Sequence, residues 1–189
     1  DEVSRLLELD LHTIDGIAVS AGPGSFTGLR IGSATAKGLG LALKKPLLAV
    51  PTVEALAYNL WGSSALICPI MDARRSQVYT GLYYAEEELQ TEKEPCAMDM
   101  HELISELNAR GERTVFLGDG VPVYESLIRR ELTVAYSFAP PQSSRQRAAS
   151  VAALGELYMK QGRMVTAADF KPEYLRKPQA EREREGIEL

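Results

Sequence analysis

The stretch AGPGSFTGLRIG, residues 21–32, is the part of the sequence most suited to chemistry, because glycine-rich loops that precede helices can hold phosphate groups. A Walker loop requires four residues between its glycines and then Lys-Ser/Thr, whereas three residues separate Gly24 from Gly28 and Leu29 follows. A dinucleotide fingerprint requires a third glycine at the position of Thr27, and an acidic residue about 20 positions on, where the sequence reads LLAV. Neither phosphate motif is present.

We therefore interpret this loop as a structural turn from a strand into a helix. Gly22 and Gly24 supply the backbone freedom for a sharp turn, and Pro23 stiffens it. The start of the helix retains the capacity of every helix start to bind an anion.

Residues typical of nucleophiles and metal sites are few and scattered. Cys68 and Cys96 form neither a paired metal motif nor a disulfide framework, and we expect them to be spare thiols. His12 and His101 are far apart in sequence, and His101 occupies a position in a helix start that favours exposure to solvent. We predict no metal, no cofactor and no catalytic residue.

Asp72, in MDARRS, could be a carboxylate at the end of a strand, which is a common catalytic position. The adjacent Arg74 and Arg75 favour an ion-paired turn instead.

Composition limits the classes of protein that remain. The chain has 189 residues and a hydrophobic content of 45%, which suits one or two small lobes. Its net charge of −5 argues against a surface that binds nucleic acid without a partner protein. No run approaches the roughly 18 apolar residues of a membrane span, and no secretory signal opens the sequence. We expect a cytoplasmic protein without a membrane partner, and any role with RNA would need another protein.

The elements that must position these residues follow from hydrophobic periodicity. Residues 1–16 read as the last turns of a helix followed by a loop, 17–20 as a buried strand, 25–44 as a helix that Pro46 stops, and 47–50 as a strand. A helix over 52–60, with Thr52 as a plausible N-cap, comes next. Alternation of strand and helix predicts parallel pairing.

From Ala65 the pattern changes to two strand-like runs, 65–73 and 77–87, joined by RRS, which predicts an antiparallel step and a second lobe. Asp99 and Glu102 have the spacing of a capping box and Gly111 closes the helix that follows. Further elements are expected as a strand at 114–118, a helix at 121–132, a strand at 133–137 and a helix at 145–162, and the charged tail over 171–189 is expected to be exposed.

The helix over 25–44 carries an unusual distribution of side chains. Arg30, Ser33, Lys37 and Lys44 fall within one narrow arc, and nearly every other residue is apolar or small. We therefore expect coverage on two sides, with the polar arc in solvent. Glycine and alanine recur every four residues and predict a strip for close approach by another chain; the partner-binding residues are Gly28, Gly32, Ala36, Leu39, Gly40 and Leu43. The alternative is that one side meets the sheet and the other meets only a first helix of the same lobe.

Three motifs in order, GPGSFTGLRIGSATAKGL, MDARRSQVYTGLY and PEYLRKPQAE, closely resemble the bacterial TsaB family, whose older name is YeaZ. The resemblance implies an α/β fold of the actin-like, sugar-kinase and Hsp70 ATPase (ribonuclease H-like) type in two lobes. We place the rest of the first lobe at 1–64 and the second lobe at 65–189. The family opens with a β-meander and a first helix, and this chain is expected to lack the meander and most of that helix.

The resemblance also implies a function. TsaB-like proteins are regarded as non-catalytic partners of the TsaD-type transferase, which moves a threonylcarbamoyl group onto the adenosine beside the anticodon of ANN-reading tRNAs, and the TsaE-type ATPase joins that pair. A homodimeric binding module and a kinase-like or metallopeptidase-like enzyme of the same superfamily remain alternatives. The TsaD-type metal pair, H-x-x-x-H, has no counterpart in the spacing of His12 and His101.

Overall fold

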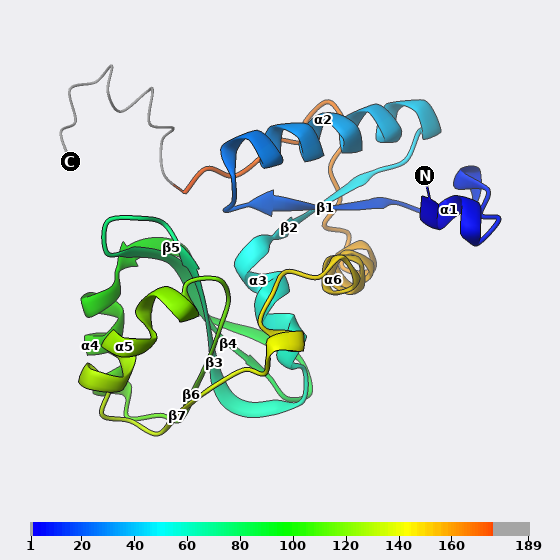
Figure 1. Ribbon diagram of the computed structural model, residues 1–189. Coiled ribbons are helices and arrows are strands. Elements are labelled where there is room, and N and C mark those ends of the chain that lie inside the picture. The colour runs from blue at the N-terminus through cyan, green and yellow to red at the C-terminus, as the bar shows by residue number, and fades with distance from the viewer. Residues whose placement is uncertain (1, 176–189) are drawn as a thin grey trace, which may run out of the picture.

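The computed structural model describes residues 2–175 and contains two β-sheets with helices packed on them (Figure 1). The first half holds these elements in chain order: α1 Glu2–Leu6, η1 Leu11–Thr13, β1 Ile17–Gly22, α2 Phe26–Leu43, β2 Leu47–Pro51, α3 Thr52–Ala57 and η2 Tyr58–Leu60. The second half holds β3 Ser63–Asp72, β4 Gln77–Ala85, β5 Leu89–Asp99, α4 Met100–Arg110, β6 Thr114–Leu117, α5 Val121–Glu131, β7 Tyr136–Phe138, η3 Pro141–Ser143 and α6 Ala148–Lys160. The prediction for the tail beyond Leu175 lies outside the described residues.

The first sheet pairs β1 and β2 in parallel, as the alternation of strand and helix predicts. Its two faces are covered by different helices, which Figure 1 shows on opposite sides of β1. Helix α2 packs over the side chains of Ile17, Val19 and Leu47, whereas α6 packs over Ala18 and Leu48. This alternation is the pattern of strands that are buried on both faces.

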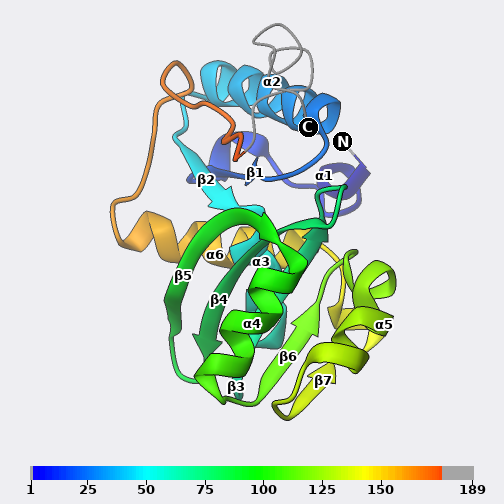
Figure 2. The same cartoon turned by 90° about the vertical axis from the view of Figure 1, so that its left-hand side faces the viewer.

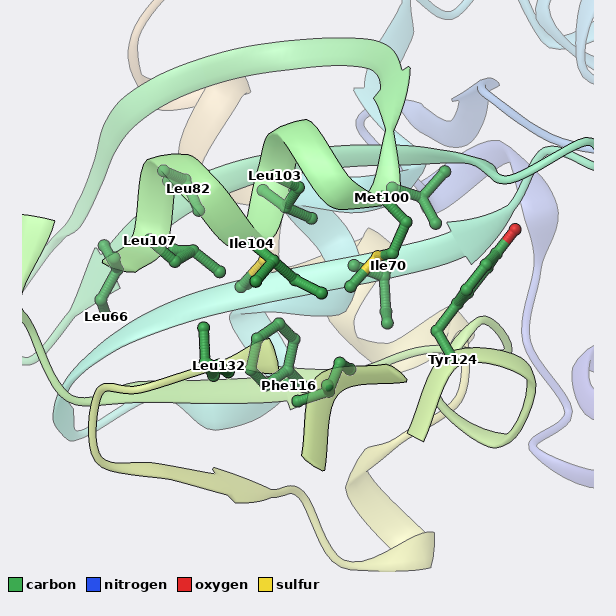
Figure 3. Packing of buried hydrophobic residues seen from close by; sticks show 13 residues of the cluster. Leu66, Ile70, Leu82, Met100, Leu103, Ile104, Leu107, Phe116, Tyr124 and Leu132 are labelled. Carbon is green, nitrogen blue, oxygen red and sulfur yellow. The ribbon is translucent and has the colours of Figure 1, made fainter. Parts of the chain in front are cut away.

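The second sheet has the strand order β5-β4-β3-β6-β7 (Figure 2). β3 and β4 form the predicted antiparallel step, and β3, β6 and β7 run parallel. Helices α4 and α5 cover one face over a core that includes Leu103, Ile104 and Phe116 (Figure 3). Helix α3 covers the other face through Val53 and Leu56.

Helix α6 differs from the expected division of the chain. The boundary between the two lobes was predicted at 64/65, whereas β3, the first strand of the second sheet, already begins at Ser63. α6, however, packs on β1 and β2 of the first sheet. The close approach is possible because Gly155 has no side chain: a Cβ added there would lie 2.5 Å from the Cβ of Ala18.

Three local predictions need correction. The edge strand β5 was not predicted, because its exposed residues are polar or charged and Pro95 lies opposite an irregularity in β4, where a residue without an N–H is tolerated. Thr52 is the first residue of α3 and not its N-cap; Pro51 holds the cap position. The last strand is Tyr136–Phe138, shifted from the predicted 133–137. The cap of α4 is confirmed, since Asp99 accepts from the His101 N–H at 2.8 Å and Gly111 adopts a left-handed conformation.

A half-buried carboxyl ties α3 to α6. The Tyr158 hydroxyl donates to Glu54 Oε1 at 2.5 Å, and the Arg163 guanidinium lies 3.5 Å from the centre of the Tyr158 ring. Burial raises the pKa of Glu54, and this effect outweighs the opposing ones of the Tyr158 hydrogen bond and the charge of Arg163.

This raised pKa predicts a pH-dependent stability. The folded protein holds the Glu54 proton more tightly than the unfolded chain, so this contribution is greatest below the ordinary value of 4.5 and is lost as the pH rises through the folded pKa. Glu54→Gln removes the titration and should therefore gain stability over the wild type as the pH rises from about 4 to about 7. Thermal unfolding across that range measures the difference.

Glu156→Gln on the exposed side of α6 is the matched control. The Lys160 hydrogen bond and charge lower the pKa of Glu156, so the control is expected to lose stability relative to the wild type over the same pH range. Parallel pH profiles for Glu54→Gln and the wild type would show that the Glu54 carboxyl does not contribute.

Candidate functional site

The turn that leads from β1 into α2 is built around Gly22. Its φ is +128°, which side chains rarely adopt, and a Cβ added there would lie 2.3 Å from the carbonyl oxygen of Glu173. That segment is held by the Glu173 N–H, which donates to the Ala21 carbonyl at 2.7 Å. Pro23 is buried and follows a cis peptide bond. Both residues act in a structural turn, as the sequence predicts.

Gly24 contributes less to the sharp turn than predicted. A Cβ there would meet the Leu29 side chain at 3.6 Å, which is an ordinary contact, and its φ is not in the left-handed region. The sharp turn therefore depends on Gly22, and Ser25 then caps α2 by accepting from the Gly28 N–H at 3.3 Å.

The inner side of α2 packs on the first sheet. Four residues of α2 are buried: Leu29, Ser33, Ala36 and Gly40. A Cβ added at Gly40 would lie 3.2 Å from the Leu47 side chain and 3.3 Å from Ala167, and Ala36 belongs to the same hydrophobic cluster. The glycine at position 40 thus lets α2 approach the sheet closely.

The predicted polar arc does not face solvent throughout. Ser33 is only 6% exposed, and Lys37 is half-buried under residues 165–174, which we call the strap. The Lys37 Nζ donates to the carbonyl oxygens of Phe170 at 3.1 Å and Ala168 at 3.4 Å. The strap supplies acceptors that sequence periodicity could not anticipate. Ser33 and Lys37 therefore lie against the rest of the chain, whereas Arg30 and Lys44 of the same arc are exposed.

No described element covers the outer side of α2 (Figures 1 and 2). We call this surface the α2 outer face and define it by Ile31, Ala34, Gly38, Leu41 and Ala42, which are all exposed. Ile31 is 63% exposed and Leu41 is 67% exposed. A Cβ added at Gly38 would have no atom within 4 Å, so small residues form a flat strip between the two large ones.

The predicted partner-binding residues do not all lie on one surface of α2. Gly28 and Leu39 are exposed at the border of the α2 outer face, and Gly32 and Leu43 are half-buried. Ala36 and Gly40 are buried against the chain's own sheet and strap, so their assignment to a surface for another chain is wrong. The predicted set did not include the exposed residues of the α2 outer face, Ile31, Ala34, Gly38, Leu41 and Ala42. The small residues that are exposed therefore lie on a different side of α2 from the predicted strip.

Asp72 organises the β3–β4 turn. Its carboxylate accepts from the Arg74 N–H at 2.9 Å and from the Tyr124 hydroxyl at 3.4 Å, and the Arg74 Nε lies 3.7 Å away. Arg74, Arg75 and Ser76 have left-handed φ values of +66°, +56° and +58°, which these hydrogen bonds help to hold. The ion-paired turn predicted at this position is present for Arg74.

The other reactive side chains are held separately. The His101 Nδ1 lies 2.8 Å from a Glu131 carboxylate oxygen on the surface. Cys68 is fully buried, and burial raises the pKa of its thiol to about 12, which leaves little thiolate at neutral pH. Within residues 2–175 no group of three His, Cys, Asp or Glu side chains is placed to hold a metal ion. Over the same residues, every helix is too short or too polar to cross a membrane.

Comparison with known proteins places this architecture in a defined class. Residues 1–184 match the family model of TsaD, tRNA N6-adenosine threonylcarbamoyltransferase. The fold is of the actin-like, ribonuclease H-like α/β type, and YeaZ from Pseudomonas aeruginosa superposes with a TM-score of 0.76 at 24% identity, over 92% of this chain and 79% of that one.

Two named relatives identify the family more closely. TsaB of Bacillus subtilis, named a tRNA threonylcarbamoyladenosine biosynthesis protein, is 34% identical over 169 residues, which span 87% of this chain and 71% of the relative. TsaB of Escherichia coli is 39% identical over 80 residues, or 41% of this chain and 34% of that protein. The chain belongs to the TsaB (YeaZ) family.

Proposed function

We propose that this protein is a non-catalytic partner in tRNA threonylcarbamoyladenosine biosynthesis, and that it binds a TsaD-type transferase through the α2 outer face. Family membership supports the pathway, since the B. subtilis and E. coli relatives are named for it. The exposed apolar surface of α2 is the observation that carries the proposed role as a partner.

Burial of the α2 outer face against a partner would be favourable in free energy. Full burial of a side chain such as Ile31 or Leu41 stabilises a complex by about 1.5–3 kcal/mol relative to exposure. Ala34 and Gly38 between them allow a partner helix to approach closely, because they present almost no side-chain volume. A charged or RNA-binding surface would show lysine and arginine here, and the outer face has none.

The proposed absence of catalysis agrees with how the reactive groups are used. Asp72 serves the β3–β4 turn, and the Cys68 thiol is buried and protonated. The transferase, and with it the TsaE-type ATPase, would supply catalysis and the principal contacts to tRNA.

The experiment combines the purified chain with a TsaD-type transferase and a TsaE-type ATPase and measures transfer of the threonylcarbamoyl group to tRNA. We expect transfer only when the transferase is present, and stimulation by this chain. Alone, the chain should show no steady ATP hydrolysis and no peptidase activity. Turnover by the chain alone that is lost in Asp72→Asn would contradict the proposed role.

A homodimer through the α2 outer face is the competing outcome for the same surface. Sedimentation of the chain alone and mixed with the transferase separates the two. A heterodimer at equimolar mixing supports the proposal, and a homodimer that the transferase does not disrupt overturns it.

A further inference from the structure

A groove of about 520 Å³ lies between the end of α2 and the strap, which passes beside that end of the helix in Figure 2. One side of it is lined by residues that include Leu41, Lys44 and Lys45, and the other by residues that include Met164 and Ala168. Leu41 also belongs to the α2 outer face, so the groove continues that surface past the end of the helix. A partner that docks on the α2 outer face would therefore reach the groove.

Most of the groove is apolar and accessible to solvent. Met164 is 44% exposed and Leu41 is exposed as well, so both side chains keep apolar surface in contact with water. The remaining uncharged residues that line the groove are small or apolar, except Thr166: Gly40, Pro46, Val165, Ala167 and Ala168. An apolar side chain placed against Leu41 and Met164 would remove surface of both from water, which is favourable in free energy.

The charged residues that line the groove are both lysines. Within residues 2–175, the ammonium groups of Lys44 and Lys45 have neither a hydrogen bond nor an ion pair. No aspartate or glutamate is among the described residues that line the groove, and the carboxylate of Asp169 in the strap accepts from the Thr166 hydroxyl at 2.6 Å. The groove is therefore positively charged in a chain whose net charge is −5, and this charge favours an acidic group as its partner.

Lys44 also has a backbone conformation that is unfavourable for a lysine. It is the C-cap of α2, and its φ of +55° lies in the left-handed region, where glycine is the usual residue. Glycine would end the helix with less strain, so the lysine side chain brings no benefit to the cap itself. What the lysine adds at this position is a positive charge in the groove.

We propose that the groove receives a segment of the TsaD-type transferase in which an apolar side chain lies next to a carboxylate. The apolar side chain would pack against Leu41 and Met164, and the carboxylate would pair with Lys44 and Lys45. This inference rests on the proposed function, in which the transferase docks on the α2 outer face. An RNA phosphate would pair with the lysines but would leave the apolar residues without a contact, so a polypeptide fits the groove better.

Calorimetric titration of the transferase in the absence of RNA tests this inference with the double variant Lys44→Gly/Lys45→Gln. Removal of both charges is expected to weaken pairing about tenfold or more at an ionic strength of about 0.05 M. The difference from the wild type should shrink at about 0.5 M, because dissolved ions screen the attraction that the variant lacks. Lys44→Gly alone should be at least as stable as the wild type in thermal unfolding, because it relieves the left-handed strain, and should nevertheless pair more weakly.

Met164→Ser tests the apolar half of the groove. The substitution replaces an exposed apolar side chain by a small polar one and should weaken pairing about threefold or more. Arg113→Gln is the matched control for charge, since Arg113 is exposed, precedes β6 of the second sheet and loses one positive charge in the variant. The control should pair within about twofold of the wild type.

The outcomes separate this inference from the proposed function. Circular dichroism verifies that each variant is folded. Wild-type affinity in the folded double variant, or an equal loss in Arg113→Gln, would overturn the inference and leave the partner role intact. Unchanged affinity in Met164→Ser would also overturn it, in favour of an occupant recognised by charge alone. Failure of the wild type itself to pair with the transferase would overturn the proposed function and this inference with it.

Discussion

Replacement of Ala34 by glutamate is expected to weaken association with the TsaD-type transferase by about 100-fold or more. Ala34 is exposed between Ile31 and Leu41, so the new carboxylate leaves the isolated chain unstrained. On docking, the same carboxylate would be taken out of water against the apolar residues of the α2 outer face, which is strongly unfavourable. Calorimetric titration of the transferase with the variant and with the wild type gives the ratio of dissociation constants.

Ala152→Glu is the matched control for this experiment. Ala152 is exposed on α6, so the control introduces the same side chain at a helical position away from the α2 outer face. It is expected to pair with wild-type affinity. If Ala34→Glu remains folded and pairs as well as Ala152→Glu, the interface does not include the α2 outer face.

Ala36→Glu would not test the interface. The Ala36 side chain is 5% exposed and packs against the chain's own core, so a carboxylate there would be buried in every state of the protein. Loss of pairing by this variant would report loss of folding.

Gly118→Ala is expected to cause the largest loss of stability among single substitutions at glycine. Gly118 has a φ of +107°, and a Cβ there would lie 2.2 Å from the carbonyl oxygen of Ile70 and 3.0 Å from its carbonyl carbon. Both atoms belong to the backbone of the central strand β3, which cannot move aside cheaply. We expect destabilisation of about 3 kcal/mol or more, measured by urea unfolding.

Gly162→Ala is the control that isolates backbone strain from collision. Gly162 also has a positive φ, +73°, but a Cβ there would have no atom within 4 Å. The expected cost is the left-handed penalty alone, about 1–2 kcal/mol. Equal destabilisation by the two substitutions would show that the close approach of Gly118 to β3 is unimportant.

Local patterns were sufficient to predict most of the elements. The 17–20 and 47–50 runs were correctly read as strands that pair in parallel, although residues 17–20 are only half-buried. The caps of α4 were correct because Asp99 and Gly111 act through short-range hydrogen bonds and backbone conformation, which do not depend on the rest of the fold.

The orientation of α2 could not be predicted in the same way. Its apolar and small residues extend around most of the helix, so periodicity could not decide which side meets the sheet. The deciding contacts come from the strap, more than 120 residues away in sequence, whose carbonyl groups accept from Lys37. A polar arc was therefore assigned to solvent, and the strip of Ala36 and Gly40 was assigned to a partner.

Hydrogen–deuterium exchange of this chain with and without the TsaD-type transferase tests the central claim most directly. We predict that complex formation slows exchange in peptides from α2, residues 26–43, because the α2 outer face becomes buried and the helix is held against its partner. Peptides from α6, residues 148–160, should exchange at the same rate in both samples. Unchanged exchange across α2 in a sample where sedimentation shows the complex to be formed would contradict the account.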